Sequence, residues 1–372
     1  MSATPFRFRV EQLLEQADVA VDGDRPWDLR VNHPRFVQRV LAQGSLGFGE
    51  SYMDGWWEAE SPDQLLTRLI KANLNNKVKS VVVAFDAVKA KFLNRQTISR
   101  SFQVGEKHYN AGNDLYQKML DQRMIYSCAY WQGADNLEQA QKNKLDLICR
   151  KLDLQPGEKV LDIGCGWGGT AKFMAERYDV DVVGVTISSS QATLAREKCR
   201  GLPIEIRLQD YRDLDGQFDK IVSVGMFEHV GHKNYRTYFR KVAELLVDQG
   251  LFLLHTIGGN TPATRTYPWI ERYIFPNGVI PSSQQVSRAF EGSFVLEDWH
   301  NFGPDYDQTL MAWQDNFERA WPELQKDYDD RFRRMWLYYL NCSAASFRAR
   351  DNQVWQLVLS KNGIAGGRKF PR

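Results

Sequence analysis

The sequence lacks the features that mark several large classes of protein. Its cysteines form no CxxC pair and are odd in number, at positions 128, 149, 165, 199 and 342. This usage fits a reducing cytoplasm and argues against a disulfide framework or a zinc cluster, so no metal site is predicted. The N-terminus shows no signal-peptide pattern, and no stretch approaches the roughly 20 apolar residues that span a bilayer. Any contact with a membrane is therefore expected to be peripheral.

Net charge gives little indication of a partner, because it is only +2 over 372 residues, but its distribution is uneven. Residues 65–107 carry nine basic and two acidic side chains. Within them Val81, Phe85, Val88 and Phe92 have helical spacing, with lysines off that stripe, as in a helix on an anionic membrane surface. An ordinary surface helix with a solvated basic face explains the pattern slightly better. No nucleic-acid-binding motif is present, so nucleic acid is not expected as a partner.

Three parts with different patterns follow one another along the chain. Residues 1–91 read as short helices, one of which has Ser61 at its N-cap and Pro62 at its first position. Residues 92–112 are polar and show little periodicity, which indicates a linker that also donates residues to the active site. From residue 113 to 372 strands alternate with helices, a pattern that predicts a parallel sheet.

The alternating region contains several recognisable elements. Helices are expected after Gly168 and from a cap near Ser188. The stretches predicted as strands are 160–163, 179–186, 203–208, 219–225, 250–256 and 354–360. Such a chain forms a doubly wound α/β sheet, whose ligands bind at the carboxyl ends of the strands.

A glycine-rich loop, VLDIGCGWGG, ends the first of these strands. Gly164, Gly166 and Gly169 fit the GxGxxG pattern of dinucleotide binding. However, Asp162 suits a cationic amino-acid cofactor better than a pyrophosphate, and the next strand ends in Thr186 where a nicotinamide enzyme would place an acid. The pattern D-x-G-x-G-x-G instead resembles motif I of the S-adenosylmethionine-dependent methyltransferases.

Longer stretches make the resemblance more specific. In chain order they are HYNAGNDLYQKML, MIYSCAYW, GVTISSSQ, LQDYRDL, MFEHVGHKNY, FLLHTIG, YIFPNG, EDWHNFGPDYDQTL and FRARD. Together they closely resemble the cyclopropane-fatty-acyl-phospholipid synthases over roughly residues 100–360. The resemblance implies a mostly parallel, seven-stranded methyltransferase sheet and S-adenosylmethionine as the methyl donor.

The same resemblance implies a reaction and a setting. The reaction is transfer of a methylene group to the cis double bond of unsaturated acyl chains, and a methyltransferase that makes methyl-branched chains is the alternative. Mycolic acid cyclopropane synthases generally lack the helical N-terminal unit, so its presence favours phospholipid acyl chains as the substrate. A cytoplasmic homodimer, peripherally attached to the inner face of the cell membrane, is implied as well.

The chemistry of this reaction places demands on the site. Methylation of an alkene leaves a carbocation, which water would trap, so the site must be apolar and closed. It must offer aromatic faces to a cation and supply a base that removes a proton from the new methyl group. The resemblance implies that this base is a bicarbonate ion held by Cys128, Glu228, His255, Ile257 and Tyr306.

These residues are not weighted equally. Glu228 follows a buried strand and is ranked first, and His255 closes another strand at its carboxyl end. For Cys128 the backbone is expected to matter more than the thiol. His229, although it adjoins Glu228, has no implied role and is expected to make local hydrogen bonds.

A cysteine near the C-terminus has been proposed as catalytic in such enzymes, in the context C-x-x-x-F-R. Counting back from Phe347 places Ser343 there, with Cys342 one residue early. On a helix that shift turns the side chain by about 100°. The Cys342 thiol is therefore included as a minor candidate and expected to be dispensable.

The methyl donor is the other ligand that the resemblance implies. Tyr211 is expected to lie by the adenine, and Asp210 to accept from its amino group. The ribose is left to either Thr186 or Gln191. The full set of implied donor-binding residues is Tyr126, Ser127, Asp162, Gly164, Gly166, Thr186, Ile187, Gln191, Asp210 and Tyr211.

Overall fold

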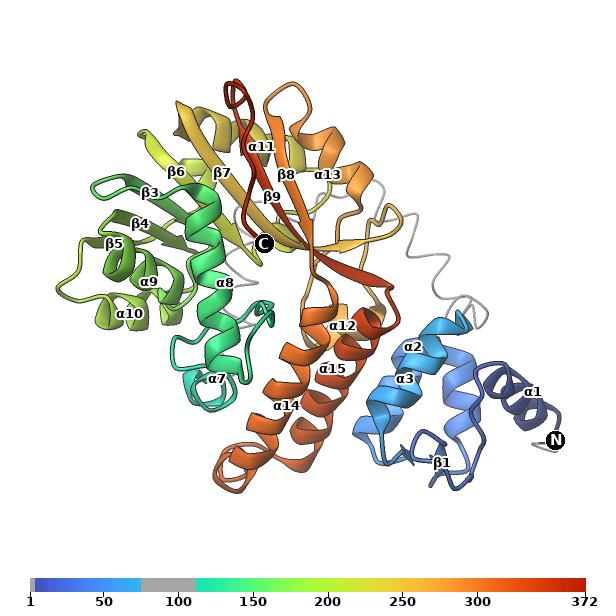
Figure 1. Cartoon of the computed structure of the whole chain (residues 1–372). Coiled ribbons are helices and arrows are strands. Elements are labelled where there is room, and N and C mark those ends of the chain that lie inside the picture. The colour runs from blue at the N-terminus through green and yellow to red at the C-terminus, as the bar shows by residue number, and fades with distance from the viewer. Residues whose placement is uncertain (1–3, 75–111) are drawn as a thin grey trace. The chain divides into compact units, whose positions relative to one another are not determined.

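The computed structural model of the chain describes residues 4–74 and 112–372, with side chains from residue 10 onward (Figure 1). The helix predicted at 81–92 and nearly all of the predicted linker at 92–112 lie outside the described residues. The chain divides into a smaller unit of Met1–Leu93, Arg265–Pro276 and Leu310–Asn352, and a larger unit of Asn94–Thr264, Asn277–Thr309 and Gln353–Arg372.

The larger unit is built on a seven-stranded sheet with the order β5-β4-β3-β6-β7-β9-β8. Neighbouring strands from β5 to β7 pair in parallel, and β8 pairs antiparallel with β9. This mostly parallel sheet confirms the predicted fold class. The strands are β3 (Lys159–Ile163), β4 (Asp181–Thr186), β5 (Ile204–Leu208), β6 (Phe218–Val224), β7 (Leu246–Gly259), β8 (Val295–Asn301) and β9 (Asn352–Ser360).

Strand β8 was not among the stretches predicted from the sequence. It lies at an edge of the sheet, where its side chains are exposed or half-buried. Val295 and Leu296 are 44% and 41% exposed. A strand that buries neither face has no hydrophobic alternation, and the pattern VLEDWHN therefore does not identify it.

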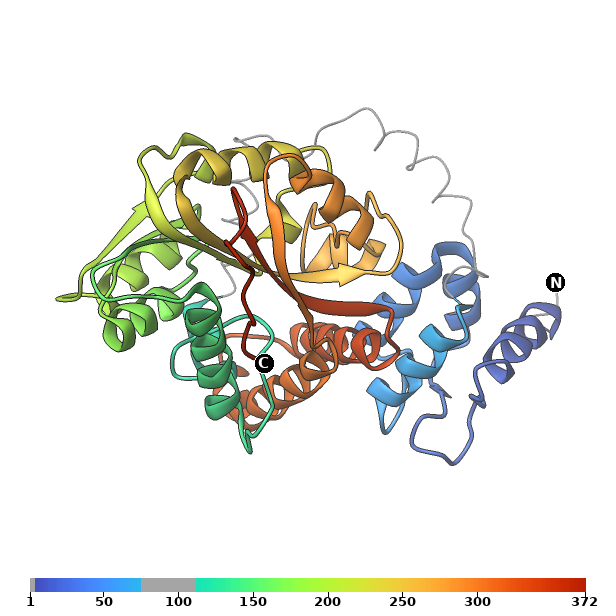
Figure 2. The same cartoon turned by 45° about the horizontal axis from the view of Figure 1, so that its top comes forward.

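Helices cover both faces of this sheet (Figure 1, Figure 2). Alternate strand residues such as Val160 and Val182 pack with α8 (Leu137–Leu152) and α9 (Gly169–Tyr178). Their neighbours, such as Leu161 and Val183, pack with α11 (Tyr235–Leu245) and α13 (Ser283–Phe290). The two-residue period of the strands thus divides the core into two layers, as a doubly wound sheet requires.

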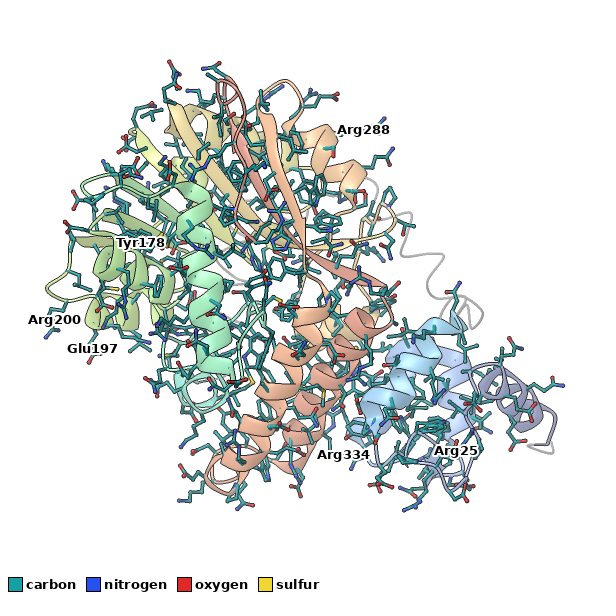
Figure 3. All side chains as sticks on the ribbon, viewed as in Figure 1. Arg25, Tyr178, Glu197, Arg200, Arg288 and Arg334 are labelled. Atoms are coloured by element: carbon teal, nitrogen blue, oxygen red, sulfur yellow. The ribbon has the colours of Figure 1, made fainter. Side chains whose placement is uncertain are left out.

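Helix ends in the larger unit are fixed by polar contacts. As predicted, Ser188 caps α10 (Ser189–Lys198), its side chain accepting from the backbone N–H of Gln191. On the same face of the sheet, Tyr178 at the end of α9, labelled in Figure 3, donates its hydroxyl to Asp146 of α8 at 2.8 Å. This bond ties α9 to α8.

The smaller unit gathers helices from distant parts of the sequence. Glu50 of α2 accepts hydrogen bonds from Arg39 (2.7 Å) and from the hydroxyl of Tyr273 in α12 (2.8 Å). Ser61 and Pro62 begin α3 as predicted, but the Ser61 side chain makes no capping hydrogen bond. The helices are α1 (Thr4–Glu15), α2 (Phe36–Met53), α3 (Pro62–Lys71), α12 (Pro268–Tyr273), α15 (Asp330–Arg348) and, from Leu310, most of α14 (Pro304–Leu324).

Three further elements belong to the two units. In the smaller unit β1 (Arg30–Val31) pairs antiparallel with β2 (Trp57–Glu58), and in the larger unit α7 (Asn113–Met119) precedes α8. No helix in the described parts of the chain has the length and apolar character needed to cross a membrane.

Candidate functional site

A pocket opens at the carboxyl ends of β3, β4, β5 and β6 in the larger unit. The chain runs outward from β3 to β5 on one side and from β6 on the other, so the strand order reverses beside β3. This reversal is where doubly wound sheets bind ligands. All ten residues implied as donor-binding line the pocket, from Tyr126 to Tyr211.

The glycine loop forms the floor of this pocket. The N–H groups of Gly164 and Cys165 both donate to the carbonyl of Val185, at 2.9 and 3.0 Å, and so tie the loop to β4. Gly164 has φ of +85°, and a Cβ there would lie 2.7 Å from the Met226 side chain. Only glycine fits this position, and the backbone is therefore left open toward a ligand.

Asp162 lies on β3 directly below the loop and is 1% exposed. Burial raises the pKa of its carboxyl to about 7, although the positive charge of Lys144 opposes the shift. Its Oδ2 has no hydrogen-bond partner among the described residues. A buried, unsatisfied carboxylate oxygen is costly, and it fits a cationic ligand group that would pair with it.

Two side chains at the end of β4 are bonded to each other. The Thr186 hydroxyl donates to Oε1 of Gln191 at 3.0 Å, and it accepts from the Ser188 N–H at 3.2 Å. The hydroxyl is thus engaged by protein groups as donor and as acceptor. Gln191 retains its amide nitrogen for other contacts.

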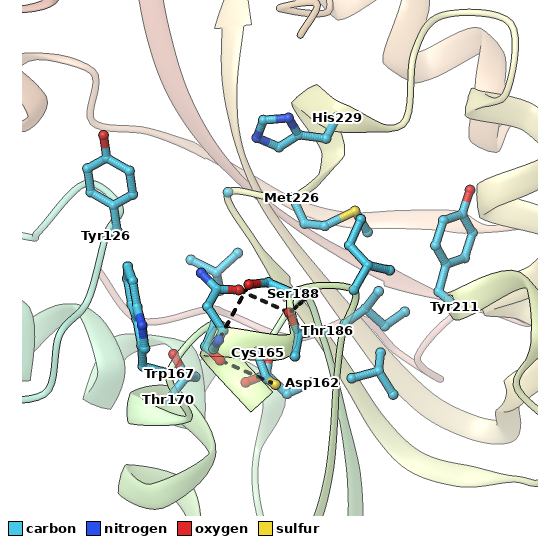
Figure 4. A pocket seen from close by; sticks show the side chains of 18 of the residues that line it. Tyr126, Asp162, Cys165, Trp167, Thr170, Thr186, Ser188, Tyr211, Met226 and His229 are labelled. Atoms are coloured by element: carbon cyan, nitrogen blue, oxygen red, sulfur yellow. Dashed lines mark hydrogen bonds between the residues drawn. The ribbon is translucent and has the colours of Figure 1, made fainter. Parts of the chain in front are cut away.

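Aromatic side chains stand on opposite sides of the pocket (Figure 4). Tyr126 and Trp167 lie on one side and Tyr211 on the other, with Met226 between them. The Tyr211 ring contacts that of Tyr238 edge-on at 5.2 Å, and burial raises the pKa of the Tyr211 hydroxyl. This hydroxyl is therefore protonated at neutral pH.

Asp210 is held by a neighbour that the sequence analysis did not identify. Both of its carboxylate oxygens accept from the guanidinium of Arg212, at 2.6 and 2.8 Å, and one also accepts from the Arg212 N–H. This bidentate pair fixes the carboxylate at the pocket wall. The carboxylate keeps lone pairs available for a donor from a ligand.

A second group of polar residues lies beyond the turn that follows β6. This turn contains a short 3-10 helix, Phe227–His229, and within it Glu228 accepts a hydrogen bond from the backbone N–H of Ile257 at 2.6 Å. Its other oxygen, Oε2, is buried without a hydrogen-bond partner in the described parts of the chain. Burial raises the pKa of Glu228. The carboxyl therefore keeps a proton to a higher pH than an exposed glutamate.

His255 lies on β7, two residues before Ile257. Its carbonyl accepts from the N–H of Gly225 at 2.9 Å, and its Nδ1 lies 3.4 Å from Nε2 of Gln356 on β9. Burial lowers the pKa of His255 well below its ordinary value, and the charge of Lys144 adds to the effect. The imidazole is therefore neutral at pH 7.

The segment that carries Cys128 docks on the first turn of α14, which contains Tyr306. The N–H of Ala129 donates to the Thr309 hydroxyl at 3.1 Å, and the N–H of Trp131 donates to Asp305 at 2.7 Å. Cys128 is fully buried, and burial raises the pKa of its thiol well above the ordinary value. The thiol is therefore protonated at neutral pH, in agreement with a backbone role.

The two groups of residues share one backbone turn. Met226 and His229 line the donor pocket, whereas Glu228 between them is bonded to Ile257 of β7. Burial lowers the pKa of His229 to about 4, so the ring is neutral. Local hydrogen bonds were expected for His229, but its place in the lining of this pocket was not predicted.

The remaining candidates belong to the smaller unit. Cys342 belongs to α15 of the smaller unit, where burial raises the pKa of its thiol to about 12. Ser343 follows it, and its carbonyl accepts from the Ser346 hydroxyl at 2.7 Å. Within the described ranges no cluster of His, Cys, Asp or Glu side chains could hold a metal ion.

Two buried lysines of α8 were also missed. Lys144 and Lys151 are both 0% exposed, and burial lowers the pKa of each to about 8. Both share one helical face with Ile148, which is part of the core. This helical spacing was the one sign in the sequence that the two lysines face the core. Lysines are so rarely buried, however, that the face of LEQAQKNKLDLICRKL that carries them is interpreted as exposed to solvent.

Comparison with known proteins agrees with this geometry. A sequence profile described as mycolic acid cyclopropane synthetase matches residues 96–357. The chain is 54% identical over 362 residues to the cyclopropane-fatty-acyl-phospholipid synthase of Escherichia coli K12, covering 97% of this chain and 94% of that protein.

Solved structures show the same fold. The cyclopropane synthase MmaA2 from Mycobacterium tuberculosis superimposes with a TM-score of 0.66 at 32% identity, covering 70% of this chain and 98% of that one. The mycolic acid cyclopropane synthase CmaA1, complexed with SAH and CTAB, gives 0.65 at the same identity and the same coverage.

Proposed function

Because this chain belongs to the mycolic acid cyclopropane synthetase family, it is a methyltransferase enzyme that acts on lipid, and we propose its specific reaction. It transfers a methylene group from S-adenosylmethionine to the cis double bond of unsaturated fatty acyl chains in membrane phospholipids. The product is a cyclopropane ring. Phospholipid as the substrate is supported by the identity to the Escherichia coli synthase, which extends over 97% of the chain, including its N-terminal helices.

One observation carries the proposal: the donor pocket and the buried carboxyl of Glu228 meet at a single turn. Met226 and His229 face the pocket, and Glu228 faces β7. Ring closure requires a methyl donor on one side of the alkene carbon and a proton acceptor near the methyl group as it is transferred. A shared turn brings these two functions together.

The pocket residues fit S-adenosylmethionine, which supplies an electrophilic methyl group on a sulfonium. The unsatisfied oxygen of Asp162 suits the amino group of the donor. Of the two candidates for the ribose, Gln191 is favoured, because the Thr186 hydroxyl is already engaged on both sides. A relative of known structure holds SAH, the form that the donor takes after transfer.

We also propose that Glu228, His255, Ile257, Tyr306 and Cys128 form a bicarbonate site. A bicarbonate ion bound there would supply the base that accepts the proton. An ionised glutamate would repel this anion. Burial raises the pKa of Glu228 and so favours its protonated form, in which Oε2, the oxygen without a partner among the described residues, would donate to the bicarbonate. The neutral ring of His255 adds a second uncharged group that can share a hydrogen bond with the anion.

Burial around these groups suits the carbocation that the reaction forms. Glu228 and His255 are 8% and 2% exposed, and the ring of Phe302 lies 5.6 Å from that of His255. Water is thus kept from the groups that would face the cation. This exclusion favours loss of a proton over addition of water.

The substrate requires contact with a membrane, because its acyl chains lie in the bilayer. We propose that the enzyme works as a homodimer bound peripherally at the cytoplasmic face, with the N-terminal helices taking part in the contact. Pairing two such units would raise the apparent affinity for the surface through avidity.

The proposal is tested with S-adenosylmethionine labelled by three deuterium atoms in its methyl group. Purified protein is incubated with this donor and vesicles that contain a cis-unsaturated phospholipid, and the lipid is examined by mass spectrometry. Retention of two deuterium atoms indicates a ring, whereas retention of three indicates the methyl-branched product, whose formation also needs a reductant. Absence of label from the lipid would contradict both reactions.

A further inference from the structure

Lys144 is a buried cation that the reaction described above does not use. It lies on the inner face of α8, and its Nζ donates to the hydroxyl of Ser127 at 2.9 Å. Among the described residues it forms no ion pair within 4.0 Å, whereas Lys151, seven residues later, pairs with Asp298 at 3.1 Å. The buried carboxyl of Asp121, and less strongly that of Asp162, favour the charged form of Lys144, but its hydrogen bond is to a neutral hydroxyl, so retention of this buried charge calls for a reason.

The partner of Lys144 is held a second time by the same helix. Gln141, one turn earlier and also fully buried, donates from Nε2 to the carbonyl of Ser127 at 2.9 Å. One residue is therefore fixed through its side chain and through its backbone. This double attachment locks the position of the Tyr126–Cys128 segment against α8.

That segment belongs to both sites. Tyr126 and Ser127 line the donor pocket, and Cys128 is one of the residues of the proposed base site. The segment also lies against Gly225, because a Cβ there would be 3.7 Å from that of Ser127. The N–H of Gly225 in turn donates to the carbonyl of His255. A shift of Ser127 would therefore displace residues of both sites.

The charge of Lys144 acts on the same groups. It opposes the effect of burial on Asp162 and so helps that carboxyl to ionise. It also helps to keep His255 neutral. Both effects favour the protonation states that a cationic donor and a neutral imidazole require.

We propose that Lys144 is a positioning residue, which holds the Tyr126–Cys128 segment in place through Ser127 for binding of the methyl donor. The inference rests on the proposed function, because it assumes that the pocket takes that donor. It predicts that Lys144 controls donor affinity and its pH dependence without touching the reacting atoms.

Binding of S-adenosylhomocysteine, measured by calorimetry between pH 5.5 and 7.5, where Lys144 with its pKa of about 8 stays mostly charged, tests the proposal independently of turnover. In the unaltered protein, affinity rises with pH as Asp162 ionises, with a midpoint near its pKa of about 7. In Lys144→Met affinity falls by about tenfold, as expected for a lost charge and hydrogen bond, and the midpoint moves to higher pH. Lys144→Gln, whose amide can still reach a hydroxyl, shows the same shift of the midpoint.

Lys151→Met is the matched control, because Lys151 is equally buried on the same helix. It is expected to lower the thermal midpoint at least as much as Lys144→Met does, while the affinity and its pH midpoint stay unchanged. Equal stability loss in both variants, with unaltered binding in both, would overturn the proposal.

Gln141→Leu provides a second test of the positioning role, which can be used if the Lys144 variants do not fold. It removes one of the two bonds to Ser127 and leaves the charge in place, so affinity falls and the pH midpoint stays. Unchanged affinity in that variant would refute the positioning role. If the unaltered protein bound no S-adenosylhomocysteine at all, the proposed function would fail, and this inference would fail with it.

Discussion

The backbone N–H of Ile257 donates a 2.6 Å hydrogen bond to Oε1 of Glu228, so the turn after β6 is fastened near the carboxyl end of the long strand β7. The bond holds a buried carboxyl in one orientation, with its second oxygen unsatisfied. Glu228 can therefore be altered without changing the donor pocket on the other side of the turn.

Glu228→Gln is expected to abolish turnover while donor binding survives. The amide oxygen can still accept from Ile257, but an amide N–H donates a weaker hydrogen bond to bicarbonate than a carboxyl O–H and cannot relay the proton that bicarbonate takes up, so we expect a loss of at least about 100-fold in rate. Transfer of label to lipid and calorimetry with S-adenosylhomocysteine measure the two effects. Loss of donor binding instead would move Glu228 out of the proposed base site.

Removal of bicarbonate should lower activity and leave donor binding intact. In buffers freed of carbon dioxide the rate of labelling is expected to fall, and added bicarbonate should restore it. Chloride at the same concentration is the control for ionic strength. A rate that does not depend on bicarbonate would assign the base to a protein group.

Asp162→Asn should stabilise the unliganded protein above neutral pH while weakening donor binding. Since burial raises the pKa of Asp162 from 3.8 to about 7, the folded state keeps a proton that the unfolded chain has lost. Stability therefore falls as pH rises across this interval. The asparagine removes that loss, which amounts to a few kcal/mol at about 1.4 kcal/mol per pKa unit.

Thermal unfolding at pH 5 and pH 8 checks this expectation. The stability gain of Asp162→Asn should be less than half as large at pH 5 as at pH 8, because pH 5 lies within the interval between 3.8 and about 7, and donor affinity at pH 8 should be lower in Asp162→Asn. An equal stability difference at both pH values would show that Asp162 does not titrate in this range.

Gly164→Ala should remove donor binding, because its φ of +85° disfavours any side chain and the Met226 side chain occupies the space. Gly157→Ala is the matched control, since Gly157 has φ of +80° with no atom near an added Cβ. Only the backbone strain, about 1 kcal/mol, is expected there. If both variants bound S-adenosylhomocysteine equally, close approach at the loop would not matter.

Cys128→Ala and Cys342→Ala should each retain most activity. Burial keeps both thiols protonated at neutral pH, so neither can serve as a thiolate. The labelling assay measures the activity that each variant retains, and resistance of the unaltered protein to thiol reagents shows that neither thiol is reactive. A loss above about tenfold in Cys342→Ala, with stability unchanged, would restore the thiol as a candidate.

Much of the fold could be predicted from the sequence, because buried strands are recognisable as short apolar runs. The alternate residues of β3 and β4 belong to opposite core layers, and the stretches that carry them were identified from apolar runs bounded by turns. The exposed edge strand β8 offered no such signal. The packing of α12 with α2 could not be predicted from the sequence either, because it depends on contacts such as that of Tyr273 with Glu50, 223 residues apart.

Residues that belong to sequence motifs could be named as site candidates in advance. Residues that packing alone brings to the site could not. The family resemblance implied ten donor-binding residues, and all ten line one cavity, while their contacts with the donor stay a prediction. Lys144 could not be found this way, because the composition of its helix suggests a solvated face. Its burial becomes evident only from the contact with Ser127, which lies 17 residues earlier.

The turn between Met226 and Val230 constrains how this protein can diverge. Consecutive residues there serve different sites, so inserting or deleting one residue would rotate Glu228 away from Ile257 and present a different side chain to the donor pocket. Substitutions can be accepted one at a time, but a change in length would disable both sites at once. Loops such as the one at Gly157, which touch neither site, are where insertions can accumulate and where a fused domain could be added.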